Sequence, residues 1–203
     1  MDELMNLETI TVLLSIVSVL GTIGTFYFGI KSNRLEKQRY SLTWKEVETG
    51  SLQLLRESES KFHPDILLMI SGPSAIVASL AMIQSRQFFP VYTAVLENKR
   101  ELLFKYKPKG HTEISTTKWN IYLPEQLCRE VDKRILVIHD CVMSGDVQAT
   151  ICHFLLEKGF PRDHIFLATL VCSELAFESK KAPDYHWYKN PHKDLYFPWG
   201  RWF

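Results

Sequence analysis

The feature that most constrains this chain is an uncharged, apolar segment close to its start. Thr9 to Ile30 is a run of 22 residues without a charged side chain. An α-helix rises about 1.5 Å per residue, so this run would extend roughly 33 Å, close to the thickness of the hydrocarbon core of a bilayer. We therefore expect a transmembrane anchor followed by a separately folded part.

The charges on the two sides of this segment predict its orientation. Acidic residues precede it, without a lysine or arginine, whereas the residues that follow it are mainly basic. A secretory signal peptide has the opposite charge order. By the positive-inside rule the N-terminus lies outside and the rest lies in the cytoplasm. Residues 1–40 are thus predicted to be an anchor with a basic juxtamembrane segment, and residues 41–203 a cytoplasmic domain.

Small residues recur every four positions within the predicted anchor, at Gly21, Thr25 and Gly29. This spacing lets two membrane helices approach closely, so it predicts a homo-oligomer formed through the anchor. The alternative is that glycine and threonine are simply frequent in such helices.

A second apolar run, Ile66 to Ile83, has two interpretations. Its 18 uncharged residues reach the lower limit for a second membrane span. The pair Gly72-Pro73 favours the other interpretation, because it divides the run into a buried strand over Asp65–Ser71 and a helix that begins near Ser74.

The rest of the chain alternates between strand and helix patterns. Hydrophobic residues make up 46% and charged residues 23%, which is typical of a globular domain, and the net charge of +1 does not indicate a nucleic-acid partner. A polar, basic and aromatic stretch is predicted to be a solvated hairpin, with nucleic-acid contact as the alternative. The alternation predicts an α/β fold, a mainly parallel sheet flanked by helices, with ligands at the carboxyl ends of its strands. The predicted helices are 42–57 and 146–158, the strands 88–96, 134–139 and 164–173, and the hairpin 99–122.

The four cysteines show neither a CxxC motif nor the spacing of metal ligands. We therefore predict reduced, buried thiols in a cytosolic domain and no metal site.

One strand-to-helix turn carries a family resemblance. The sequence ILVIHDCVMSGDV, from Ile135 to Val147, resembles the phosphoribosyl-diphosphate loop of type I phosphoribosyltransferases. In such a loop, acids bind the ribose hydroxyls directly or through Mg²⁺, and the turn at a helix N-terminus cradles the 5′-phosphate. The resemblance assigns these roles to five residues: His139, Asp140, Ser144, Gly145 and Asp146.

Two further stretches resemble this family in the same order. The helix near Trp44 and the strand before Gly72 are similar to the opening helix and first core strand, after which the family has its pyrophosphate-binding loop. That loop falls on Ser71, Gly72, Pro73 and Ser74. The stretch from Asp194 resembles the end of purine-type members and suggests base-pocket residues, with a packed C-terminal plug as the alternative. The base-pocket candidates are Leu195, Tyr196 and Trp199.

The chain also departs from the family pattern where chemistry depends on it. His139 replaces the first acid, Met143 replaces the general base and cannot accept a proton, and Asp146 would repel a phosphate. The pyrophosphate position lacks the family's arginine, and three cations could compensate: Arg86, Lys107 and Lys109. These losses predict a degenerate active site, for which Mg²⁺ and phosphoribosyl diphosphate matter only if the enzyme is active. Asp140 then binds a ribose hydroxyl or a cation, or only caps the following helix, and His139 is a pH-sensitive ligand or a hydrogen-bonded structural residue.

This layout of an anchor and a damaged nucleotide-enzyme fold resembles small membrane effectors of bacterial anti-phage systems, including retrons. The resemblance implies a domain used for sensing or docking and an anchor that damages the bacterial inner membrane. It also implies a reverse transcriptase with its RNA–DNA product as a partner. The alternatives are an active membrane-tethered phosphoribosyltransferase or nucleotide hydrolase, and a membrane scaffold protein without a ligand.

Overall fold

The computed structural model describes residues 40–100, 108–191 and 195–201. The predicted anchor, Thr9–Ile30, lies outside the described residues together with the small residues inside it, so its membrane insertion and self-association stay predictions. No helix in the described part of the chain is long and apolar enough to cross a membrane. Ser41–Phe203 form one compact unit.

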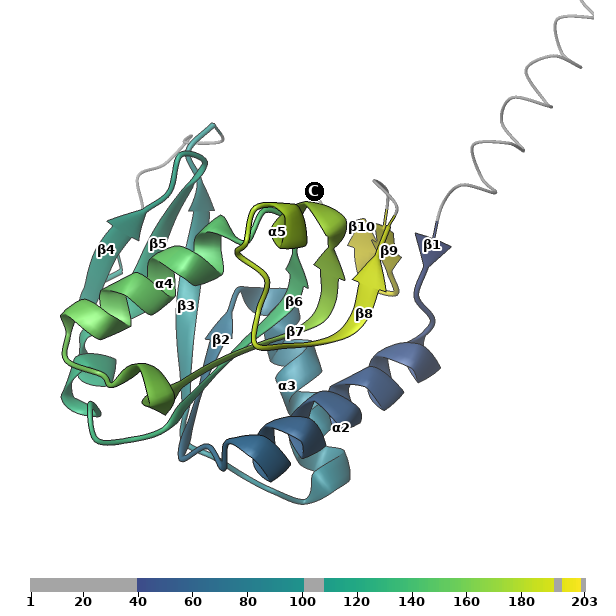
Figure 1. The fold of residues 1–203 in the computed structure, drawn as a ribbon, viewed down its shortest axis with the longest axis horizontal. Coiled ribbons are helices and arrows are strands. Elements are labelled where there is room, and N and C mark those ends of the chain that lie inside the picture. Colours follow the sequence, from purple (N-terminus) through teal and green to yellow (C-terminus); the bar gives the residue numbers. More distant parts are fainter. Residues whose placement is uncertain (1–39, 101–107, 192–194, 202–203) are drawn as a thin grey trace, which may run out of the picture. The chain divides into compact units, whose positions relative to one another are not determined.

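The centre of this unit is a mixed, mainly parallel sheet with strand order β4-β5-β3-β2-β6-β7-β8 (Figure 1). The strands are β2 (Ile66–Ile70), β3 (Val91–Asn98), β4 (His111–Ser115), β5 (Trp119–Pro124), β6 (Ile135–Val142), β7 (Ile165–Ser173) and β8 (Tyr185–Asn190). The five strands from β3 to β8 are parallel, and β5 and β4 add an antiparallel hairpin at the β3 edge. The predicted α/β sheet and hairpin are confirmed, and β8 was not predicted.

Helices cover both faces of the sheet. The helices are α2 (Trp44–Lys61), α3 (Gly72–Ser85), α4 (Asp146–Glu157) and the short α5 (Glu174–Glu178), with 3₁₀ turns at η1 (Glu125–Arg129) and η2 (Arg162–His164). Helices α2 and α3 lie side by side on one face, and α4 lies on the other, toward the β4–β5 hairpin (Figure 1). Helix α2 begins with a capping box, in which the Thr43 hydroxyl accepts from the Glu46 amide at 3.3 Å and the Glu46 carboxylate accepts from the Thr43 amide at 2.7 Å.

The second apolar run forms a strand, a turn and a helix, as Gly72-Pro73 indicated. Strand β2 ends at Ile70, and α3 begins at Gly72, two residues earlier than predicted. Pro73 fits the first turn because its missing N–H would have no partner inside the helix. Ser71 alone makes the connection, with a φ of 79° that is uncommon for a residue other than glycine.

Strand β6 is buried along its whole length, from Ile135 to Val142. On the α4 side, Ile135 and Val137 join a cluster that includes Ile151 and Leu155 of α4. A parallel strand that is covered on both faces needs apolar residues on both, which explains its continuous hydrophobic sequence. The strand runs three residues beyond the predicted end and carries the first part of the phosphate-loop motif into the interior.

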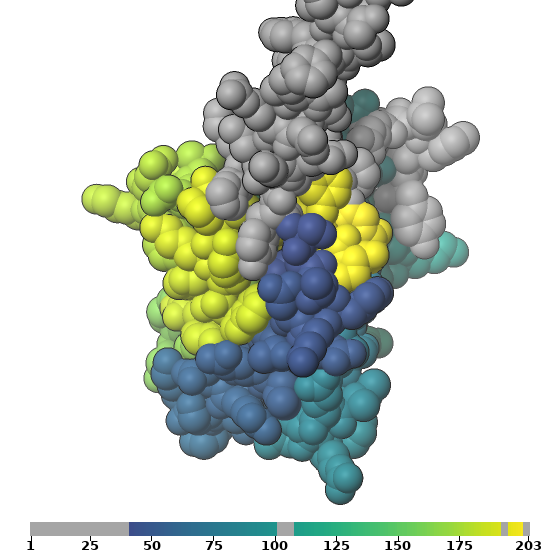
Figure 2. Space-filling model, turned by 90° about the vertical axis from the view of Figure 1, so that its right-hand side faces the viewer, coloured from purple at the N-terminus to yellow at the C-terminus, as the bar shows by residue number. Residues whose placement is uncertain are grey.

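The C-terminal residues pack against the start of α2. Strands β1 (Tyr40–Ser41), β9 (Leu195–Phe197) and β10 (Gly200–Arg201) form a small second sheet. The Leu42 amide donates to the Tyr196 carbonyl at 2.8 Å. Figure 2 shows the yellow C-terminal strands directly beside the purple and blue start of α2. This packing corresponds to the predicted C-terminal plug.

All four cysteines are free thiols; Cys141 and Cys172 are buried as predicted, whereas Cys128 and Cys152 are only partly buried.

Gly50 provides a test of how tightly α2 packs on the sheet. A Cβ at this position would lie 2.6 Å from Leu170 Cδ1 and 2.6 Å from the Trp187 ring. Alanine is the better helix former by about 1 kcal/mol, yet we expect Gly50→Ala to lower the free energy of unfolding by about 1–3 kcal/mol, because the helix must move outward. Denaturant unfolding followed by tryptophan fluorescence measures this, with the exposed Glu48→Ala of the same helix as the control. A more stable Gly50→Ala protein would show that α2 is loosely packed.

Candidate functional site

A pocket of about 390 Å³ opens at the carboxyl ends of β2 and β6. This is the edge of a parallel sheet at which α/β proteins usually bind ligands. The lining residues come from both strand-to-helix turns, the β3–β5 edge and the C-terminal segment: Ser71, Pro73, Leu96, Trp119, the whole stretch from His139 to Gln148, and Trp199.

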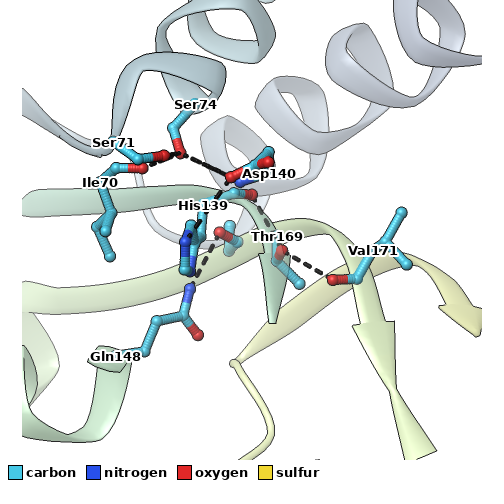
Figure 3. Close-up of polar contacts among 9 residues, drawn as sticks. Ile70, Ser71, Ser74, His139, Asp140, Gln148, Thr169 and Val171 are labelled. Atoms are coloured by element: carbon cyan, nitrogen blue, oxygen red, sulfur yellow. Dashed lines mark hydrogen bonds and ion pairs between the residues drawn. The ribbon is translucent and has the colours of Figure 1, made fainter. Parts of the chain in front are cut away.

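Two adjacent polar side chains of β6 point to opposite faces of the sheet. Asp140 is directed toward Ser71 and Ser74 at the start of α3, and His139 toward Gln148 of α4 (Figure 3). Asp140 is 3% exposed and His139 7% exposed, so both are inside the protein. The alternation of side chains along a strand produces this arrangement, in which one residue belongs to each half of the core.

Ser74 connects the two turns through its hydroxyl group. The Asp140 amide donates to Ser74 Oγ at 3.2 Å, and Ser74 Oγ lies 3.2 Å from Asp140 Oδ1 and within hydrogen-bonding reach of the Ile70 carbonyl. Burial raises the pKa of Asp140 to about 6, although hydrogen bonds from the backbone and from Ser74 act in the opposite direction. Near pH 7 most of this carboxyl group is therefore ionised inside the protein.

His139 is uncharged near pH 7. Burial lowers its pKa to about 4, and its Nε2 lies 3.7 Å from Asp140 Oδ1. Its Nδ1 is buried and has no hydrogen-bond partner among the described residues. A neutral imidazole next to a carboxylate places its proton on the nitrogen that faces the carboxylate, which leaves Nδ1 as an acceptor.

At the turn that the family resemblance assigns to a 5′-phosphate, three side chains of the chain pair with one another. Ser144 Oγ donates to Asp146 Oδ2 at 2.8 Å, and Lys181 Nζ donates to Asp146 Oδ1 at 2.5 Å. The hydrogen bond from Lys181 is the main cause that lowers the pKa of Asp146. Gly145 has a φ of 78°, and a Cβ there would lie 2.3 Å from the Lys181 carbonyl oxygen, so only glycine fits. The Asp146 carboxylate thus brings a negative charge to this turn and is hydrogen-bonded to Ser144 and Lys181.

The first turn is short. Ser71 is its only connecting residue, and Gly72, Pro73 and Ser74 already belong to α3. Of these four, Ser71 and Pro73 line the pocket, whereas Ser74 is buried beneath it.

The three base-pocket candidates of the C-terminal segment lie in different environments. Trp199 lines the pocket, Leu195 is buried elsewhere, and Tyr196 is not among the lining residues. Three residues of the site were missed as site residues: Trp119 and Gln148, which line the pocket, and Lys181, which pairs with Asp146. Their only sequence signal was indirect: the hairpin stretch was interpreted as solvated, and Lys181 lies 35 positions from its partner.

Lysine and arginine are absent from the described residues that line the pocket. Of the cations expected to compensate for the missing arginine, Arg86 lies at the C-terminal end of α3 and Lys109 precedes β4, and neither lines the pocket. Lys107 lies outside the described residues. The structure therefore does not place Arg86 or Lys109 at the pocket, where either would compensate for the missing arginine.

The residues present do not fit Mg²⁺ with a diphosphate. The position of the first acid is a neutral histidine, Asp140 hydrogen-bonds to Ser74, and Asp146 is paired with Lys181. The described part of the chain contains no group of three histidine, cysteine or acidic side chains placed to hold a metal ion. Mg²⁺ in phosphate chemistry is usually held by one or two carboxylates together with the substrate phosphates, and here the acids at the two positions are replaced by a histidine or paired within the chain.

Several solved structures with a similar fold are phosphoribosyltransferases. The chain is similar to a purine phosphoribosyltransferase from Pyrococcus horikoshii, with a TM-score of 0.56 and 16% identity over 82% of this chain and 96% of that one. It is similar to the xanthine-guanine-hypoxanthine phosphoribosyltransferase of Helicobacter pylori, with a TM-score of 0.56 and 17% identity over 80% and 94%. A hypothetical protein from Neisseria gonorrhoeae with bound ppGpp gives a TM-score of 0.58 and 17% identity over 79% and 88%.

No protein-family model and no curated protein matches the sequence. At 16–17% identity the structural matches show the fold alone. The described domain therefore has a type I phosphoribosyltransferase-like fold, and what it does has to be argued from its own side chains.

Asp140 and His139 should have opposite effects on stability as pH changes. The pKa of Asp140 rises from 3.8 to about 6 on folding, so its contribution to the free energy of unfolding is lost as pH rises through this interval. The pKa of His139 falls from 6.5 to about 4, so its contribution is lost as pH falls through that interval. Each effect is on the order of 3 kcal/mol, at about 1.4 kcal/mol per tenfold change in proton affinity.

We expect the two effects to offset each other in the unaltered protein between about pH 4 and 6. Asp140→Asn should become more stable as pH rises through this range, and His139→Gln less stable. Guanidinium unfolding followed by tryptophan fluorescence reports on the domain, because all five tryptophans follow residue 40. The exposed Asp132→Asn is the control, and parallel pH curves for all four proteins would contradict the assignment.

Proposed function

We propose that the protein is a membrane-anchored effector of a bacterial anti-phage system, whose phosphoribosyltransferase-like domain senses a ligand or docks a partner without catalysing base transfer. The occupied phosphate turn is the observation that carries the non-catalytic part, since Asp146, Ser144 and Lys181 satisfy one another there. The pocket itself is retained, which supports binding as the remaining role.

Three features argue against phosphoribosyl transfer in this pocket. Met143 stands where the family has a general base, and a thioether cannot take up the proton. No lysine or arginine among the described lining residues would neutralise a diphosphate. The carboxylate of Asp146 would have to leave its two partners before a phosphate could enter the turn. The fold itself also occurs in a protein with bound ppGpp, so it serves ligand binding in other settings.

The membrane role is supported by the sequence of Thr9–Ile30 and by its flanking charges. In this proposal the anchor inserts in the bacterial inner membrane with the domain in the cytoplasm, and copies associate through Gly21, Thr25 and Gly29. The partner that restrains the effector is a reverse transcriptase with its RNA–DNA product, as in the retron systems whose layout the chain resembles. Release from this partner would let the anchors damage the membrane.

The membrane role predicts depolarisation. Expression of the full-length chain alone in bacteria should lower the membrane potential reported by a voltage-sensitive dye, and a chain without residues 9–30 should not. Leu20→Arg keeps the length of the segment but should also abolish the effect, because a central arginine raises the free energy of insertion by about 2.5–3.5 kcal/mol. Leu20→Ile is the matched control. Depolarisation by the chain that lacks the segment would rule out the anchor as the damaging element.

The non-catalytic role predicts that the full-length chain releases no pyrophosphate from phosphoribosyl diphosphate with adenine, guanine, hypoxanthine or xanthine. The reason is the missing base at Met143 together with the filled phosphate turn. Turnover that Asp140→Ala abolishes would instead establish the active transferase. Absence of both depolarisation and ligand binding would leave the scaffold protein.

A further inference from the structure

Among the described residues, no lysine or arginine forms an ion pair with the Asp140 carboxylate. It is 3% exposed and largely ionised near pH 7, and its described neighbours are hydroxyl groups, amides and the neutral His139 ring. Carboxylates are rarely fully buried in proteins unless they are paired, because burial removes the water that stabilises the charge. The pocket edge at Asp140 therefore has a negative charge that is hydrogen-bonded but has no cationic partner in the described part of the chain.

Two buried acceptor atoms in the pocket wall have no hydrogen-bond partner among the described residues. Gln148 Nε2 lies 3.5 Å from the Ala168 carbonyl, but Gln148 Oε1 has no partner among the described residues. His139 Nδ1, the acceptor nitrogen of the neutral ring, has none either. Gln148 is 1% exposed, so bulk water does not satisfy it. An unpaired buried polar group is unfavourable, and here the missing groups are all donors.

The walls of the pocket suit a positive charge on an apolar body. Trp119 of β5 and Trp199 of the C-terminal segment are half-buried lining residues, and Leu96 and Val147 add apolar surface. The face of an indole ring attracts cations, and lysine and arginine are absent from the described lining. A volume of about 390 Å³ is within the range of small-molecule sites.

We propose that this pocket binds a small organic cation, an amine or amidine carried on an aromatic or apolar body. Its N–H groups donate to Asp140, its body packs against Trp119 and Trp199, and the acceptors of His139 and Gln148 contribute to the wall. Asp146 excludes phosphorylated molecules from this turn, because its negatively charged carboxylate is already hydrogen-bonded to Ser144 and Lys181 there. The proposal rests on the proposed function, in which this pocket senses a ligand, and it names the class of that ligand.

The test uses three probes that share one phenyl ring and differ in charge: benzamidine, benzamide and phenyl phosphate. Binding to the full-length chain in detergent is measured by titration calorimetry and by quenching of tryptophan fluorescence. Benzamidine should bind at least about tenfold more tightly than benzamide, because a charge-assisted hydrogen bond replaces a neutral one. Phenyl phosphate should not bind.

Two variants locate the effect. Asp140→Asn should remove the difference between benzamidine and benzamide, and Met143→Lys should abolish benzamidine binding, because the new ammonium group enters the pocket and competes for Asp140. The exposed Asp132→Asn is the matched control and should bind like the unaltered chain. Thermal unfolding of each variant confirms that it is folded. Since Met143 is a half-buried lining residue, its variant remains informative if Asp140→Asn does not fold.

Tighter binding of phenyl phosphate, equal binding of benzamidine and benzamide, or no binding of benzamidine would each overturn the proposal. These measurements do not depend on membrane damage. Their failure would remove the preference for a cation and leave the effector role in place, whereas failure of depolarisation would remove the effector role alone.

Discussion

The burial of Asp140 at the end of β6 is the constraint around which the site is arranged. Strand β6 is covered on both faces, so its last residues enter the interior whether they are polar or not. The Ser74 hydroxyl accepts from the Asp140 amide and connects β6 to the start of α3. Because a hydroxyl group has one proton, Ser74 cannot donate to the Ile70 carbonyl and to the Asp140 carboxylate at once. The carboxylate is held by hydrogen bonds from its own chain, and it has no cationic partner among the described residues.

At the second turn, by contrast, the acidic side chain is paired with a cation. Asp146 is half-exposed, and Lys181 and Ser144 satisfy its carboxylate. In a phosphoribosyltransferase this position would stay open for a phosphate, and a serine or threonine with neighbouring amides would bind it. Here the buried Asp140 has no cationic partner among the described residues, whereas Asp146 at the turn is paired with Lys181. The backbone fold is similar to that of phosphoribosyltransferase structures, and this placement of charge belongs to the present chain.

Much of the fold could be predicted from the sequence because its strands and helices are local patterns. The apolar runs gave β2, β6 and β7, Gly72-Pro73 separated β2 from α3, and Gly159 marked the end of α4. No strand was predicted after residue 173, since β8 and β9 have mixed patterns and depend on neighbours far along the chain. The site could be predicted less completely than the fold. His139, Asp140 and Ser144 follow from one motif, whereas the pairing of Lys181 with Asp146 and the wall formed by Trp119 depend on how distant segments meet.

Trp199 lines the pocket and also packs against other aromatic side chains. Its ring centroid lies 5.9 Å from that of Trp44, the first residue of α2, and 4.7 Å from that of Phe197, on which it stacks. A ligand that displaces the Trp199 ring from the pocket side would therefore disturb the contact of this ring with the start of α2. Where ligand binding and a change at the start of α2 are coupled through this ring, the coupling free energy is the same in both directions. The C-terminal segment is thereby the physical connection between the pocket and the first helix of the domain.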